Sequence, residues 1–158
     1  YSIKGGALPG QIVYKIEGSD LLTDSPQGRQ RMQQLAAHEL AHVWQNAVTR
    51  GGIGDTQPWV HEGGAEALSL QALRDAGLWT AEQVAEQAAK LQGECRDSQA
   101  KRAADPSQPA PWRDHYTCGF ARYQATGVDA FTLWKQLLAR TEETGEPYSE
   151  AMFDALAQ

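Results

Sequence analysis

The chain has 158 residues, 41% of them hydrophobic, which is the usual size of one domain with a continuous core. Its net charge of −6 argues against nucleic acid as a partner, because phosphate binding needs clustered Lys and Arg. The sequence has no run of about 18 apolar residues, which argues against a membrane-spanning segment.

The sequence begins at Tyr1, and no charged segment followed by an apolar run indicates a signal peptide. We expect residues 1–158 to form a single domain, either as a processed product or as a piece of a longer chain. The two cysteines, Cys95 and Cys118, lack the close spacing of a zinc knuckle or a redox motif. A disulfide between them would favour an exported protein, periplasmic or secreted, and two buried free thiols are the alternative.

The first predicted element is a strand over residues 11–16, where β-branched and aromatic residues follow a glycine-rich opening. The pattern predicts no second strand. Helix begins at Ser25, a suitable N-cap, and Pro26, which suits the first helical position. Apolar residues then recur at three- and four-residue steps until Gly51 ends the helix.

A second helix is predicted from Pro58, with Gly77 as its left-handed cap. Thr80 and Gln83 have the spacing of a capping box and open a third helix. Three prolines within residues 105–111 predict a loop. The remaining helices are predicted over 113–126, 129–140 and 149–157. The expected fold class is mainly α, with a small N-terminal strand region at the front edge.

The chemically informative segment is His38-Glu39-Leu40-Ala41-His42, inside the first predicted helix. Residues four apart share a helix face, so His38 and His42 can both reach one metal ion. Glu39 lies beside them and can act as the general base toward a metal-bound water. The pattern also arises by chance, since a His on an apolar face is commonly a satisfied core residue. Further ligands are therefore needed to support a metal site.

The second helix supplies carboxylates one turn apart, at Glu62 and Glu66. A catalytic zinc ion takes three protein ligands and keeps one open position, so Glu62 is the candidate third ligand. Glu66 would then accept the outer N–H of a ligand histidine. The reverse assignment stays open, because sequence fixes helix register poorly. His61 could in principle be a ligand too, but it is adjacent to Glu62, and adjacent residues do not share a helix face. Gly63 and Gly64 predict a close approach to the first helix, since each glycine otherwise costs about 1 kcal/mol in a helix.

The stretches His38 to Trp44 and Trp59 to Ala65 resemble the gluzincin zinc metallopeptidases, and in particular the catalytic domain of M1-type aminopeptidases. There, HExxH is followed after 18 residues by the Glu of an Asn-Glu-Gly-Phe-Ala stretch. Here the gap is 19 residues, and His61 stands in place of the Asn. The resemblance implies an α+β zincin-like fold, a Zn²⁺ cofactor and peptide hydrolysis.

A second block, Tyr116-Thr117-Cys118-Gly119-Phe120-Ala121, is similar to the family's Tyr-Glu-Lys-Gly-Phe-Ala. The resemblance implies that Tyr116 donates a hydrogen bond to the oxyanion that forms during hydrolysis. Such a donor is chemically required, because the tetrahedral intermediate carries new negative charge. The alternatives are that His115 is the donor, or that Tyr116 is simply a core aromatic.

The aminopeptidases also carry a Gly-x-Met-Glu-Asn stretch whose Glu binds the free amino group of the substrate. The corresponding place here, Gly5-Gly6-Ala7-Leu8-Pro9, has no carboxylate, so endopeptidase and aminopeptidase activity both stay open. We expect residues 11–16 to lie beside the cleft, where a peptide or protein substrate could add as a further strand. Two rival hypotheses are a non-catalytic zinc-binding or interaction domain and a purely structural helical domain.

Overall fold

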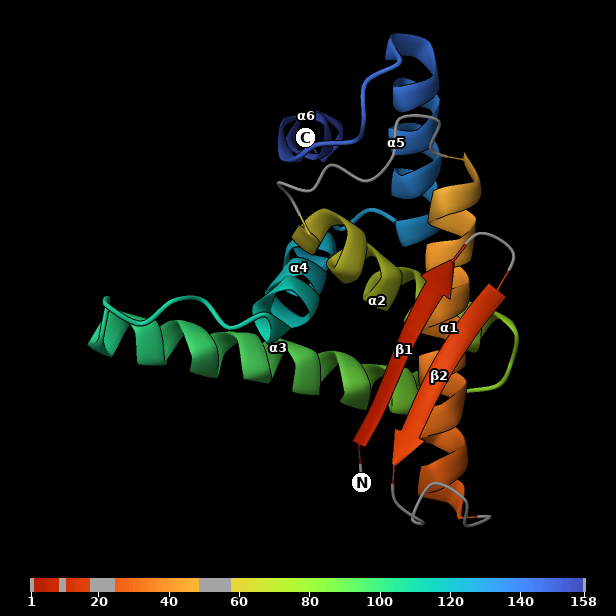
Figure 1. Ribbon diagram of the computed structural model, residues 1–158, viewed down its shortest axis with the longest axis vertical. Coiled ribbons are helices and arrows are strands. Elements are labelled where there is room, and N and C mark those ends of the chain that lie inside the picture. The colour runs from red at the N-terminus through yellow and green to blue at the C-terminus, as the bar shows by residue number, and fades with distance from the viewer. Residues whose placement is uncertain (1, 9–10, 18–24, 49–57, 158) are drawn as a thin grey trace.

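The computed structural model describes residues 2–8, 11–17, 25–48 and 58–157. Within them the fold is mainly helical, as predicted, with six helices and a small antiparallel hairpin (Figure 1). None of the described helices is long and apolar enough to cross a membrane. In chain order the elements are β1 (Ser2–Leu8), β2 (Gln11–Glu17), α1 (Pro26–Val48), α2 (Pro58–Asp75), α3 (Ala81–Ala104), α4 (Arg113–Ala125), α5 (Ala130–Thr144) and α6 (Glu150–Leu156).

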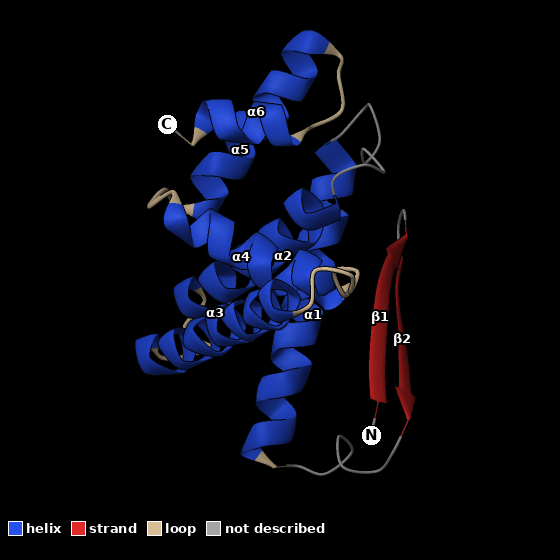
Figure 2. Ribbon diagram, turned by 90° about the vertical axis from the view of Figure 1, so that its left-hand side faces the viewer, coloured by secondary structure: helices blue, strands red, loops and turns tan. Residues whose placement is uncertain are grey.

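The N-terminal hairpin corrects the prediction of a single strand. β2 matches the predicted strand, but the glycine-rich opening forms a second one, β1, which pairs with β2 from Ser2 opposite Glu17 to Leu8 opposite Gln11. Glycine has a low strand propensity, so the pattern of side chains gave no indication of β1. The hairpin lies along α1, with β1 on the side of α2 (Figures 1 and 2).

Local capping signals explain where several helices begin and end. Gly77 has the positive φ of 67° that a left-handed cap requires. Both bonds of the predicted capping box at Thr80 and Gln83 are formed. The loop with three prolines separates α3 from α4 as predicted. α5 extends beyond the predicted residue 140 to Thr144, where Gly145 ends it with a φ of 71°.

Helix α2 is the centre of the fold, and it packs against α1, α3, α4 and α5. Its two glycines make the closest approaches. A Cβ at Gly63 would lie 2.3 Å from the carbonyl carbon of Gly119 in α4, and a Cβ at Gly64 would lie 2.4 Å from the indole nitrogen of Trp134 in α5. We expected both glycines to allow a close approach to the first helix. This was wrong, because they allow the close approach of α4 and α5 instead.

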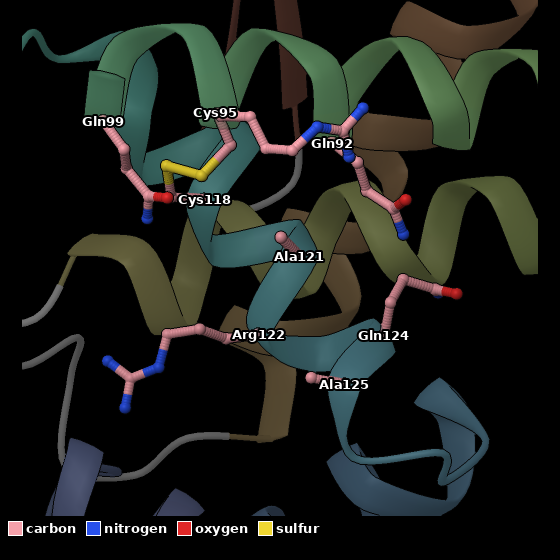
Figure 3. Close-up of a pocket in the computed structure, with 9 residues that line it drawn as sticks. Gln92, Cys95, Gln99, Cys118, Ala121, Arg122, Gln124 and Ala125 are labelled. Atoms are coloured by element: carbon pink, nitrogen blue, oxygen red, sulfur yellow. A yellow bond between two sulfur atoms is a disulfide. The ribbon is translucent and has the colours of Figure 1, made fainter. Parts of the chain in front are cut away.

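A disulfide joins Cys95 of α3 to Cys118 of α4, which resolves the choice between a bridge and two free thiols. Figure 3 shows the bridge crossing between the two helices beside Gln99. Because α4 also carries Tyr116, the disulfide ties the long helix α3 to the element that bears one of the predicted site residues.

Candidate metal centre

Helices α1 and α2 bring together the three predicted ligands. The Nε2 atoms of His38 and His42 lie 3.0 Å apart, and Oε2 of Glu62 lies 3.3 and 3.2 Å from them, respectively. This group could hold a metal ion. A regular tetrahedron with zinc–ligand bonds of about 2.0–2.1 Å has edges of about 3.3–3.4 Å. The three atoms therefore form one slightly compressed face of such a tetrahedron.

The outer nitrogen of His42 is held by Gln45, a fully buried residue one turn further along α1. The Nε2 amide of Gln45 donates to the carbonyl oxygen of His61 at 3.1 Å, so its Oε1 is left to accept from His42 Nδ1 at 2.8 Å. The proton of a neutral His42 then sits on Nδ1, and Nε2 presents a lone pair. Sequence reasoning missed Gln45, although its position three residues after His42 on one helix was an available cue.

The outer side of His38 faces Glu66. The Nδ1 atom of His38 lies 3.7 Å from Oε1 of Glu66, and no hydrogen-bond partner reaches that nitrogen among the described residues. Gln34 donates to the other oxygen of Glu66 at 3.3 Å. Glu62 thus lies on the inner side of the histidine pair and Glu66 on the outer side. This is the arrangement in which Glu62, and not Glu66, joins the three-atom group.

Charge at the centre favours a cation. When the ring protons sit on the two outer nitrogens, the inner nitrogens and the Glu62 oxygen aim three lone pairs at one point, which is repulsive unless a proton or a metal cation lies between them. Burial opposes ionisation of Glu62, but its hydrogen bonds to the two imidazoles outweigh burial and hold its pKa well below the ordinary value. Burial alone would lower the pKa of His38, yet Glu62 and Glu66 raise it.

Glu39 is buried next to this group, beneath strand β1. A Cβ at Gly5 would lie 2.2 Å from Oε1 of Glu39, so the glycine lets the strand pass directly over the carboxylate where it now lies. The other oxygen, Oε2, is buried without a hydrogen-bond partner among the described residues. Burial is the main cause that raises the pKa of Glu39. Sequence analysis expected residues 11–16 to be the strand beside the cleft. In the structure the strand that passes over Glu39 is β1.

Helix α4 brings Tyr116 to the same centre. Its ring stacks on His38, with centroids 5.6 Å apart and planes 23° apart. Burial and the negative charge of Glu62 raise the pKa of Tyr116 to about 12, while Trp112 acts in the opposite direction. His115, the alternative donor, packs its ring edge-on against Trp112 instead. Of these two neighbours, Tyr116 is thus the one whose ring contacts His38.

His61, the further ligand that the sequence left possible, lies outside the three-atom group. It is buried, and its ring lies nearly parallel to that of His42, with centroids 4.1 Å apart. Its Nδ1 lies 2.6 Å from the hydroxyl oxygen of Tyr148. Burial, with His42 as a smaller cause, lowers the pKa of His61 to about 3, so the ring is neutral at pH 7. His61 lies behind His42 and outside the three-atom group.

The fold and the site together define a mainly helical protein with a buried His–His–Glu group suited to a metal ion. No protein-family model, no curated protein and no solved structure matches the chain. A function must therefore be argued from the chemistry of the site itself.

Proposed function

We propose that this protein is a zinc metallopeptidase of the gluzincin type, with His38, His42 and Glu62 as the zinc ligands. The observation that carries the proposal is the convergence of three acceptor atoms, 3.0–3.3 Å apart, from two rigid helices. Two imidazoles and one carboxylate are a donor set that suits Zn²⁺ and leaves a fourth position open. When bound, the ion would polarise a water and the substrate carbonyl and lower the pKa of that water.

Glu39 is the proposed general base. It follows His38 directly in α1, and its buried Oε2 has no hydrogen-bond partner among the described residues. A carboxylate oxygen kept free in this way can take a proton from the attacking water. Glu39 then returns that proton to the nitrogen of the leaving amine. One residue thereby serves both proton transfers, which is why its position beside the ligand histidine matters.

Tyr116 is the proposed donor to the developing oxyanion. With a pKa near 12 its phenol keeps its proton at pH 7, so the O–H is available as a donor. The Tyr116 ring stacks on His38, and the charge of Glu62 helps to raise the pKa of the phenol, so the phenol lies beside the three-atom group. A substrate carbonyl bound beside His38 would accept a hydrogen bond from this O–H as negative charge builds on its oxygen.

The proposed substrate is an extended peptide or protein segment that pairs with β1. Of the described strands only β2 pairs with β1, so one edge of β1 is left for another strand. Its backbone passes over Glu39 at Gly5, which would align a paired peptide with the proposed base. No residue of β1 carries a carboxylate that could bind a free amino terminus, and this supports an endopeptidase.

The disulfide supports a location outside the reducing cytoplasm. Disulfide bonds persist mainly in oxidising compartments, and Cys95–Cys118 is formed. We infer that the protein acts after export, in a periplasmic or extracellular setting.

Metal analysis combined with a cleavage assay tests this function. We expect one zinc ion per chain. We also expect the protein to cleave a mixed peptide library, with the products identified by mass spectrometry. Glu39→Gln should keep the zinc and lose activity by about 10²–10⁴-fold, because the general base is removed without a ligand. Stoichiometric zinc without cleavage would identify a non-catalytic zinc-binding domain, and absence of zinc would leave only a structural helical domain.

A further inference from the structure

A second line of contacts runs from the C-terminal part of the fold to the candidate metal centre. Tyr148, in the segment between α5 and α6, is 2% exposed, and its hydroxyl oxygen lies 2.6 Å from His61 Nδ1. The planes of these two rings differ by only 10°. His61 in turn covers a face of His42, with centroids 4.1 Å apart and planes 16° apart. Tyr148 is thus connected to His42 through one intervening imidazole.

The hydrogen bond between Tyr148 and His61 has a definite direction. Burial, followed by the negative charge of Glu62, raises the pKa of Tyr148, so its hydroxyl keeps the proton. A phenol O–H is a better donor than a neutral imidazole N–H, and it therefore donates to Nδ1 of His61. The ring proton of His61 then sits on Nε2, and the bond fixes the plane of the ring.

We propose that Tyr148 is a positioning residue of the metal centre, acting through His61 on the orientation of His42. The inference rests on the proposed zinc ligation by His42. Gln45 holds His42 from the edge of its ring at 2.8 Å, and His61 holds it from one face. An edge contact leaves the ring free to rock about that bond, whereas an added face contact removes this freedom.

Pre-organisation of His42 should raise metal affinity. A ligand side chain that is already in place loses little conformational freedom when the metal binds. Without the Tyr148 hydroxyl, the His61 ring can turn about its χ2 bond, and His42 loses its fixed neighbour. Removal of outer partners of metal ligands typically weakens binding by 10–100-fold. Because Tyr148 acts one residue further out, we expect a weakening of about tenfold, the lower end of that range.

The test variant is Tyr148→Phe, which removes the hydroxyl and keeps the ring that packs on Trp134. The matched control is Tyr123→Phe. Tyr123 is also 2% exposed, and its hydroxyl donates to the carbonyl oxygen of Val60 at 2.9 Å, one residue before His61. Both variants should lower the urea midpoint of the metal-free protein. Only Tyr148→Phe should weaken zinc binding, measured by competition with a chromophoric chelator.

Two further measurements separate positioning from general destabilisation. In a His61→Phe background the acceptor is absent, so Tyr148→Phe should cause no additional loss of zinc affinity. In the metal-free protein, ¹⁵N NMR of the imidazole nitrogens should show His61 protonated on Nε2 in the wild type. The same spectrum of Tyr148→Phe should show a mixture of the two tautomers.

The outcomes distinguish this inference from the function on which it rests. A wild-type protein that binds no zinc overturns both. A wild type that binds zinc while Tyr148→Phe binds it equally well overturns the role of Tyr148 and leaves the zinc site intact. An equal loss in Tyr123→Phe, or a full additional loss in the His61→Phe background, also overturns it, because Tyr148 would then act on the fold and not through His61.

Discussion

The close approach of α2 to α4 gives a sharp prediction for Gly63→Ala. The added Cβ would lie 2.3 Å from the carbonyl carbon of Gly119 and 2.5 Å from its Cα. Ordinary carbon contacts begin near 3.5 Å, so α2 and α4 must separate by about 1 Å. The obstructing atoms are backbone atoms of a helix and cannot rotate away. The strain therefore falls on the packing of both helices.

The expected magnitude follows from two opposing effects. Alanine is favoured over glycine inside a helix by about 1 kcal/mol. Overpacking of a tight contact costs about 1–3 kcal/mol or more, and a clash of this depth with backbone lies at the upper end. We expect Gly63→Ala to lower the free energy of unfolding by about 2 kcal/mol. Because Glu62 precedes the glycine, zinc affinity should fall as well, by at least about tenfold.

Gly93→Ala is the matched control, since it makes the same change inside helix α3. A Cβ there meets only the end of the Arg96 side chain, at 3.8 Å. This variant should be more stable than the wild type by up to about 1 kcal/mol and should bind zinc normally. Urea unfolding of the metal-free proteins, with zinc affinity measured separately, provides both quantities. A Gly63→Ala protein as stable as the wild type would refute the proposed close packing of α2 on α4.

Three further predictions concern other parts of the fold. The double change Cys95→Ser and Cys118→Ser opens a loop with a sequence separation of 23 and should lower the free energy of unfolding by about 3 kcal/mol; an unchanged urea midpoint would contradict this. Gln45→Leu should weaken zinc binding 10–100-fold in a chelator competition, because His42 loses its outer acceptor, and wild-type affinity would show that the bond is unimportant. Asp129→Ala should cost about 1 kcal/mol at pH 7, since Asp129 caps α5. The backbone N–H of Thr132 lowers the pKa of Asp129, so this stabilisation is present above the ordinary carboxyl pKa and is lost as the pH falls through the lowered one. Wild type and Asp129→Ala should therefore converge in stability in acid, and a constant difference would argue against the cap.

Features carried by local sequence were the ones that sequence analysis predicted well. The capping box at Thr80 and the left-handed Gly77 need only neighbours along the chain, and both are present. The spacing of His38 and His42 likewise follows from the period of one helix. Glu62 lies on a different helix, and its meeting with the histidines was predicted only because the resemblance and the ligand count pointed to it.

Features that depend on distant packing were missed or misplaced. β1 forms because its backbone hydrogen-bonds to β2. Its glycine-rich sequence does not indicate that pairing. Gly63 correctly indicated a close approach, but a glycine does not specify which helix approaches. Tyr148 lies 87 residues from His61 in sequence, so no local pattern could connect the two. In each case the missing information was the position of a partner in space.

The four consecutive residues from His61 to Gly64 explain why the candidate site and the core of the fold depend on each other. Successive residues of an α-helix point about 100° apart, so the side chains of four consecutive residues point to all sides of the helix. Here they meet three neighbouring helices: His61 and Glu62 contact His42 of α1 at its ring face and its inner nitrogen, Gly63 meets α4, and Gly64 meets α5. A helix surrounded in this way cannot shift toward one neighbour without leaving another. Zinc that fixes Glu62 against α1 should therefore stabilise the whole fold, by about 2.7 kcal/mol at a free zinc concentration 100 times the dissociation constant.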